Sequence, residues 1–173
     1  DFARDAEPLE ADFLVADTND KLVRALIKLS NLRRDRHLRV EPAAAGIRIE
    51  DETQEAPIRF LPDYGDSQPT RFFVSTVADE AELYGDVQVQ PGDVLTSVSG
   101  MPVTEYRRRV EPVLRYSTRA QGDWEFAIAL NTEESIFGPE LDLEGEVTYS
   151  LERADGSEYQ ITMPFLEPDS LRW

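Results

Sequence analysis

Residues 91–103 are Pro91-Gly92-Asp93-Val94-Leu95-Thr96-Ser97-Val98-Ser99-Gly100-Met101-Pro102-Val103. Gly92 allows a tight turn, because glycine adopts backbone angles that are strained for other residues. Asp93 can accept backbone hydrogen bonds within that turn, and residues 94–98 are typical of a short buried strand. Gly100 then permits a second turn. The stretch therefore predicts a turn, a strand and another turn, ahead of a helix.

Further strands are predicted on both sides of this stretch. Before it, residues 72–77 are rich in aromatic and β-branched side chains, and Ile58 to Leu61 form a shorter apolar segment. After it, apolar residues alternate over 147–151 and 159–163, with Asp155-Gly156 between them as a hairpin turn. Trp124, Phe126, Ile128 and Leu130 also alternate, which predicts a strand.

Two helices are predicted. The clearer one covers residues 18–34, where apolar side chains recur every three or four residues after the capping cluster Asp17-Thr18-Asn19-Asp20. The second begins at Thr104, and Pro112 removes a backbone donor within it, so a kink or a restart is expected there. Leu38 and Val40 predict a short strand between the two.

These elements predict an α+β fold with a small, mostly antiparallel, barrel-like sheet and one main helix. We expect a short helical N-terminal segment over residues 1–40 and a strand-rich domain over 41–168. An acidic loop at 131–144 is inserted in that domain.

Composition excludes several classes of function. The 173 residues contain no cysteine and one histidine, which rules out disulfides, a thiol nucleophile and a multi-histidine metal site within one chain. The net charge of −17 opposes binding to nucleic acid and to anionic membranes, and no apolar run approaches the ~20 residues of a membrane span. We expect no cofactor and no metal. The acid excess is interpreted as a solvated surface, or alternatively as adaptation to high salt.

The sequence offers no convincing catalytic group. His37 lies in Arg33-Arg34-Asp35-Arg36-His37, where the arginines lower the basicity of the imidazole. The lysines, Lys21 and Lys28, both fall on the first predicted helix, far from any serine turn. Acidic residues are so abundant that no pair of them identifies a glycosidase. This chain by itself is therefore not expected to be catalytic.

The stretch at 91–103 resembles the core motif of PDZ domains, above all those of bacterial proteases. The strand before it and the helix and closing strands after it occur in the same order. In addition, the helix ending in Leu32-Arg33-Arg34-Asp35-Arg36-His37-Leu38 resembles the Asp-x-His segment that precedes the PDZ domain of carboxy-terminal processing (tail-specific) serine proteases. That family usually has a small residue where this chain has Arg36.

The resemblance implies a PDZ-like α+β domain and a place in a larger serine endopeptidase. The Ser-Lys catalytic pair of the family lies in a domain downstream of the PDZ domain, and this chain has no lysine after Lys28. The resemblance implies that downstream domain as a partner, and export to the periplasm or the exterior. The chain begins at Asp1 without a methionine, as a processed or excised chain would.

A PDZ-like domain would bind peptide or protein C-termini by strand addition. The predicted edge strand is Gly46-Ile47-Arg48-Ile49, and the opposite wall is the helix face of Tyr106, Val110 and Val113. Alternatively these are ordinary core residues, or Gly46–Ile49 is a helper strand and the groove shifts towards Ile58 to Leu61. Positive charge near the groove would attract a carboxylate terminus or simply neutralise neighbouring acids; it comes from Arg48, Arg107, Arg108, Arg109 and Arg115.

Three functions follow as hypotheses. The leading one is a non-catalytic peptide-recognition and regulatory region of a tail-specific protease. The alternative is a stand-alone PDZ-like scaffold or adaptor that contacts proteins through the loop 131–144 and has no protease activity. The third is a self-sufficient hydrolase that uses acidic residues.

Overall fold

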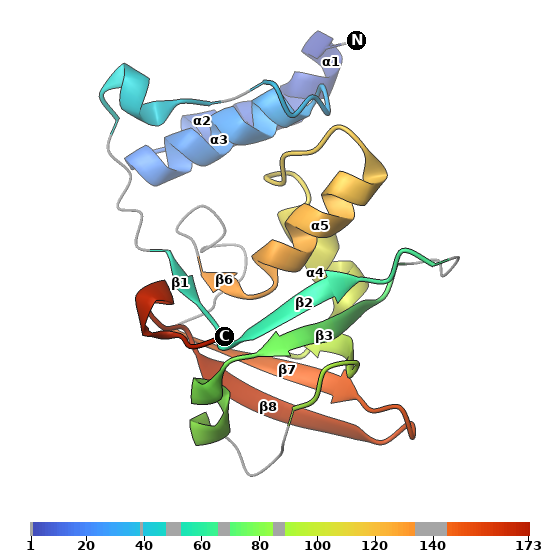
Figure 1. Cartoon of the computed structure of the whole chain (residues 1–173). Helices are drawn as coiled ribbons and strands as arrows, with labels where there is room; N and C mark the ends of the chain where they lie inside the picture. Colours follow the sequence, from blue (N-terminus) through green and yellow to red (C-terminus); the bar gives the residue numbers. More distant parts are fainter. Residues whose placement is uncertain (1, 39, 48–52, 66–69, 85–88, 134–144) are drawn as a thin grey trace.

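The computed structural model of the chain describes residues 2–38, 40–47, 53–65, 70–84, 89–133 and 145–173 (Figure 1). The N-terminal part is helical: α1 (Phe2–Ala6), the 3-10 turn η1 (Glu7–Leu9), α2 (Glu10–Leu14) and α3 (Asn19–Asn31), followed by the 3-10 turn η2 (Pro42–Ala45). The predicted helix over 18–34 is confirmed as α3. It begins where expected, because the Thr18 hydroxyl accepts a hydrogen bond from the Lys21 amide at 3.3 Å.

The larger sheet of the described chain has the strand order β2-β3-β4-β7-β8, with β5 paired to β4, and its described pairings are antiparallel. Its strands are β2 (Ile58–Pro62), β3 (Phe72–Val77), β4 (Val94–Val98), β5 (Met101–Pro102), β7 (Glu146–Glu152) and β8 (Glu158–Pro164). A small second sheet pairs β1 (Gln54–Glu55) with β6 (Thr132–Glu133). The predicted antiparallel α+β class is confirmed, but the sheet is open: β2 and β8 end the order without pairing within the described strands.

The turn at Gly92-Asp93 forms as predicted. Gly92 has a φ of 98°, in the left-handed region that favours glycine. Asp93 is buried, and its carboxylate accepts hydrogen bonds from the Gln90 amide at 2.9 Å and from the Tyr159 hydroxyl at 2.5 Å. Desolvation, with that hydrogen bond, raises the pKa of Tyr159. The aspartate therefore ties the start of β4 to β8, so the motif organises the sheet.

The helix after this turn is shorter than predicted. It is α4 (Val103–Val110), and it ends before Pro112, whose missing N–H makes it a poor helix-interior residue. Thr104 does not cap it, since Pro102 occupies the N-cap position and no side-chain cap forms. Leu38 and Val40 lie in no strand of the described chain, and a 3-10 helix, η3 (Asp79–Tyr84), follows β3.

The strand predicted over 124–130 is wrong, because this segment is the helix α5 (Arg119–Ala129). The chain starts it with a capping box: the Thr118 hydroxyl accepts from the Gln121 amide, and the Gln121 side chain accepts from the Thr118 amide, both at 3.3 Å. The described domain thus carries α4 and α5 where one main helix was predicted.

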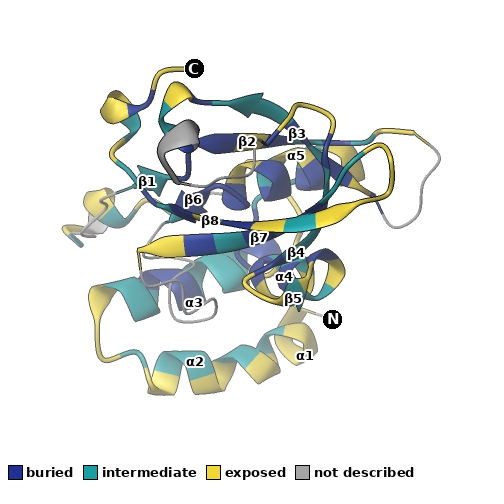
Figure 2. Ribbon diagram, turned by 90° about the horizontal axis from the view of Figure 1, so that it is seen from below, coloured by how far each residue is buried: buried dark blue, intermediate teal, exposed yellow. Residues whose placement is uncertain are grey.

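The core lies between the larger sheet and the helices α4 and α5, as the buried residues in Figure 2 show. Phe126 of α5 packs edge-on against Phe72 of β3, with ring centroids 4.9 Å apart, and lies 6.1 Å from the ring of Tyr106 of α4. Phe60 of β2 packs on Tyr149 of β7 at 5.1 Å. The Phe126 ring therefore joins α5 both to the sheet, through Phe72, and to α4, through Tyr106.

The helix α3 is hydrogen-bonded to the connection between α4 and α5. The Asn31 side chain is buried and donates to the backbone oxygens of Pro112 and Leu114, both at 3.0 Å. Just beyond α3, Arg36 lies 3.1 Å from Glu125 of α5. None of the described helices is both long and apolar enough to cross a bilayer.

Candidate functional site

The first wall of the candidate site is β2, which lies at the edge of the larger sheet. Ile58 and Phe60 are buried on its core face, whereas Arg59 between them is exposed, as expected for a strand whose side chains alternate. Among the described strands β2 pairs with β3 on one side and with none on the other. An edge strand presents backbone donors and acceptors on its outer side, which a further strand can use.

The second wall is one face of α5. Phe126 and Ala129 of this helix face the core and are almost fully buried. Trp124 and Ile128 are spaced four residues apart, share another face, and remain 47% and 45% exposed. Large apolar side chains that stay half in solvent next to an edge strand are candidates for contact with a partner.

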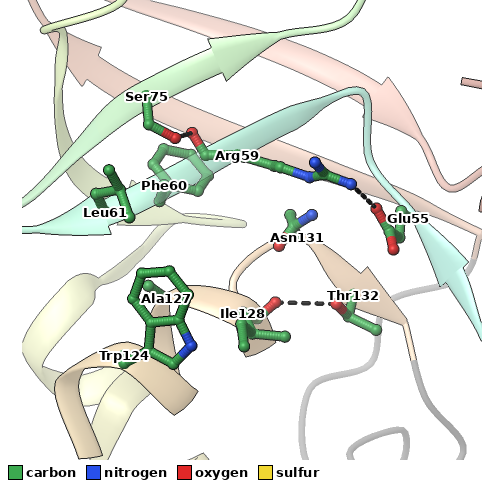
Figure 3. A pocket seen from close by; sticks show the side chains of 10 residues that line it. All are labelled: Glu55, Arg59, Phe60, Leu61, Ser75, Trp124, Ala127, Ile128, Asn131 and Thr132. Carbon is green, nitrogen blue, oxygen red and sulfur yellow. Dashed lines mark hydrogen bonds and ion pairs between the residues drawn. The ribbon is translucent and has the colours of Figure 1, made fainter. Parts of the chain in front are cut away.

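A pocket of about 320 Å³ lies between these walls (Figure 3). In Figure 3, β3 runs along one side of β2, and α5 lies on the other side with the pocket between them. Leu61 approaches from β2, and Trp124, Ala127 and Ile128 approach from α5. Five of the ten lining residues are apolar, and the polar residues Glu55, Asn131 and Thr132 gather towards one end of the pocket (Figure 3).

One end of the pocket is closed by backbone hydrogen bonds. The Ala56 amide donates to the Asn131 oxygen at 2.8 Å, so the start of β2 is tied to the end of α5. The neighbouring residues pair as Glu55 with Thr132 in the small sheet. A peptide in the pocket would therefore meet a wall at this end, and its chain could continue only towards Leu61 and Trp124.

A single cation stands at the closed end among the lining residues. The Arg59 guanidinium lies 3.4 Å from the Glu55 carboxylate and 3.7 Å from the ring centroid of Trp173. The segment that brings Trp173 there is anchored at Arg172, whose amide and Nε donate to Glu80 at 2.9 and 2.8 Å. These hydrogen bonds lower the pKa of Glu80. Arg59 is thus partly engaged but keeps an exposed side chain.

The chemistry that the pocket lining can support follows from its charged groups. The pocket lining contains one carboxylate, one guanidinium and no nucleophile held by a base, which acid–base or nucleophilic chemistry would need. The part of the chain that the structure describes contains no cluster of three or more metal-ligating side chains. What the walls offer is an apolar cleft, an unpaired strand edge and one cation.

Comparison with solved structures identifies the fold. The structure of mature CPAF complexed with lactacystin is similar to this chain with a TM-score of 0.57 and 13% identity, over 95% of this chain and 29% of that one. A crystal structure of mature CPAF has a TM-score of 0.51 and 14% identity, over 86% and 25%. The chain thus spans less than a third of the length of these structures. At such low identity the similarity concerns the fold alone, which is α+β and consistent with a PDZ-like domain.

Comparison of sequences adds nothing to this. No family model matches the chain. No curated protein matches it either. The similarity to CPAF does not single out the tail-specific protease family that the motif resembles.

The structure separates the residues predicted to form the peptide site. Gly46 ends η2 with a φ of 72°, and Ile47 follows it outside any strand, while Arg48 and Ile49 lie outside the described residues. The predicted helix wall is buried in the core, and its residues Tyr106, Val110 and Val113 are only 1%, 1% and 7% exposed. Tyr106 and Val110 belong to the core because α4 packs on β4, whereas Val113 lies beyond the end of α4, in the connection to α5. None of the three lines the pocket between β2 and α5.

The alternative groove predicted from the sequence, at Ile58 to Leu61, overlaps the pocket between β2 and α5. If Gly46–Ile49 is not the edge strand, the expected groove shifts to Ile58–Leu61, and three residues of that segment line the pocket. Its other wall, with Trp124 and Ile128, was missed because the segment was interpreted as a strand. The signal that could have found it is the Thr118-Arg119-Ala120-Gln121 capping box, followed by apolar residues at helical spacing.

The remaining candidate groups are engaged elsewhere. Arg107 pairs with Asp123, and Arg108 and Arg109 both pair with Glu105, so these arginines neutralise neighbouring acids. The His37 side chain is 93% exposed, and its Nδ1 lies 2.8 Å from the Asp35 carboxylate. The backbone amide of His37 also donates to Asp35, and this bond is the main reason that the pKa of that carboxyl is lowered. Neither the three arginines nor the His37–Asp35 pair lines the pocket between β2 and α5.

Proposed function

We propose that the groove between β2 and α5 binds an extended apolar peptide segment by strand addition, as a non-catalytic recognition region. The observation that carries this proposal is the edge strand β2 facing a helix across a pocket with two half-exposed apolar side chains, Trp124 and Ile128. Backbone bonds to the strand edge would supply affinity, and the α5 side chains would select apolar residues at alternate peptide positions.

The ligand is proposed to end at the closed end of the groove. A peptide antiparallel to β2 would place its C-terminus near the start of this strand, where the Ala56–Asn131 hydrogen bond blocks the path. Arg59 stands at this end and can exchange its 3.4 Å contact with Glu55 for a terminal carboxylate. The proposed ligand class is therefore a peptide or protein C-terminus with apolar side chains.

The parent protein is proposed to be a serine protease of the tail-specific type, with its catalytic domain outside this chain. The support is the Gly-Asp motif at 91–103, which organises β4 here, and the fold similarity to CPAF, which suggests a protease-associated domain. A recognition region of this kind would present substrate or regulatory C-termini to the neighbouring catalytic domain.

The test is fluorescence anisotropy of the purified chain with labelled peptides that end in apolar residues. We expect dissociation constants of about 1–100 μM. The double variant Trp124→Ala/Ile128→Ala should weaken binding by about tenfold or more, because it removes one apolar wall. The matched control is Leu14→Ala/Val15→Ala, whose side chains are 79% and 65% exposed at the end of α2, and which should bind normally.

Two changes in the peptide separate strand addition from other modes of binding. Amidation of the C-terminus should weaken binding to the wild-type chain but make little difference to Arg59→Gln, which lacks the cation. N-methylation at alternate amides should abolish binding, whereas methylation at the amides between them should not, because only one set faces β2. If no C-terminal peptide from a diverse library binds, the proposal fails, and the scaffold hypothesis takes its place.

A further inference from the structure

A second pocket, of about 580 Å³, lies where the chain after α3 meets α4 and the start of α5. It is lined by three arginines, Arg34, Arg107 and Arg119, and by hydroxyl groups that include those of Thr104 and Ser117. Arg34 belongs to the predicted N-terminal segment, and the other two arginines belong to the strand-rich domain. The pocket is thus built by both parts of the chain and lies apart from the groove at β2.

Each guanidinium is held in place by the protein. Arg107 donates to the buried carboxylate of Asp123 at 2.5 Å, and Arg119 donates to the Thr70 hydroxyl at 3.2 Å. The Arg34 guanidinium lies over the ring of Tyr116, 4.6 Å from its centroid. Side chains that are already positioned lose less conformational entropy when they bind a ligand.

The pocket already contains one carboxylate, which indicates the chemistry that it suits. The Tyr116 hydroxyl donates to the Glu111 carboxylate, and Arg34 lies 3.6 Å from it. Burial, helped by this hydrogen bond, raises the pKa of Tyr116 to about 12, so its hydroxyl stays a donor at neutral pH. The Glu111 carboxylate is thus an oxyanion of the chain itself that lies between the Arg34 guanidinium and the Tyr116 hydroxyl.

The local charge is positive on an acidic molecule. Three guanidinium groups stand against Glu111 and the buried Asp123, whereas the whole chain has a net charge of −17. The first turn of α5 also meets the pocket at Thr118 and Arg119, and a helix N-terminus carries partial positive charge. The three arginines and the N-terminus of α5 therefore both favour an anion in this pocket.

We propose that this pocket binds a small multivalent oxyanion, with phosphoryl or carboxyl groups, that bridges Arg34 to Arg107 and Arg119. The planar fork of a guanidinium matches two oxygens of a phosphoryl or carboxyl group. Because the ligand would contact residues on both sides of the junction, it would stabilise the attachment of the N-terminal segment to the strand-rich domain.

The experiment measures the melting temperature of the whole chain with increasing pyrophosphate or citrate, with ionic strength held constant by potassium chloride. A ligand that binds only the folded state raises the melting temperature in a saturable way. We expect such a rise with at least one of the two anions; pyrophosphate alone would indicate a phosphoryl ligand, and citrate alone a carboxyl ligand.

Three variants test the assignment. Arg34→Gln/Arg119→Gln should weaken anion binding about tenfold or more, since the double variant loses two guanidinium groups that would make charge-assisted hydrogen bonds to the anion. Arg108→Gln/Arg109→Gln makes the same change of charge on the outer face of α4 and should leave binding unchanged. Glu111→Gln should strengthen binding, because it removes the competing internal carboxylate. A rise that is equal in all variants, or equal to that with chloride, would show general screening and overturn the proposal.

Discussion

The helices α4 and α5 pack against the same sheet, yet they present their apolar side chains in opposite ways. The apolar residues of α4 turn inwards, and Tyr106 and Val110 are each 1% exposed. The helix α5 buries Phe126 but leaves Trp124 and Ile128 almost half in solvent beside β2. An apolar helix face can therefore be recognised from spacing in the sequence, but the packing of distant segments decides whether that face is buried in the core or stays half exposed.

The largest expected effect comes from truncating the buried face. Tyr106→Ala should lower the free energy of unfolding by about 3–5 kcal/mol, because it opens a cavity in the core. Trp124→Ala should cost less than about half of that, since its ring is half exposed. Chemical denaturation followed by circular dichroism measures both. Equal losses would contradict the division of the two helices into a core face and a ligand face.

A smaller change in the free energy of unfolding is expected when the threonine at the start of α5 is replaced than when the core of α4 is truncated, and it should differ from the change at the start of α4. Thr118→Ala removes the hydroxyl that accepts the Gln121 amide and should lower the free energy of unfolding by about 1 kcal/mol. Thr104→Ala is the control, because Thr104 was predicted as a cap but Pro102 holds the N-cap position of α4 without a side-chain cap. Urea titrations should therefore separate the two threonines. If the two losses are the same, α5 does not depend on its capping box.

Removing the hydroxyl from two buried tyrosines should change the free energy of unfolding by no more than the loss of the cap, with opposite signs for the two residues. The Tyr106 hydroxyl has no hydrogen-bond partner within the described structure, so Tyr106→Phe should raise the free energy of unfolding by about 1 kcal/mol. The Tyr149 hydroxyl donates to the Leu130 oxygen at 2.7 Å, so Tyr149→Phe should lower it by about 1 kcal/mol. Thermal unfolding at one pH measures both changes. A loss in both variants would mean that Tyr106 has a partner.

Local sequence was sufficient for the strands and turns around Gly92. The strands β3, β4, β7 and β8, the Gly92 turn and the helix α3 all occur where the residues predicted them. Their patterns are decided by neighbours in the chain: alternation, capping and glycine turns. The segment at 124–130 was mispredicted because apolar residues at every second position also fit a helix with two apolar faces. Phe126 and Leu130 lie on the buried face, and Trp124 and Ile128 lie on the face that stays half exposed beside β2.

The candidate site could be predicted only in part. Ile58–Leu61 was recognised as an alternative edge, but its partner helix could not be found while 124–130 was interpreted as a strand. Tyr106 and Val110 were assigned to the groove because their spacing predicts a buried face and does not say what buries it. The anion pocket joins Arg34 to Arg119, residues far apart in the sequence, and no local pattern links them.

Residue types and short-range spacing were enough to predict the α+β class, the antiparallel strands, the Gly-Asp turn and the acidic character of the chain. They could not predict that β2 lies at the edge of the described sheet, that α5 faces it, or that the apolar face of α4 is buried. Those outcomes depend on which surfaces meet, and free energy from burying apolar area is gained only when distant segments come together.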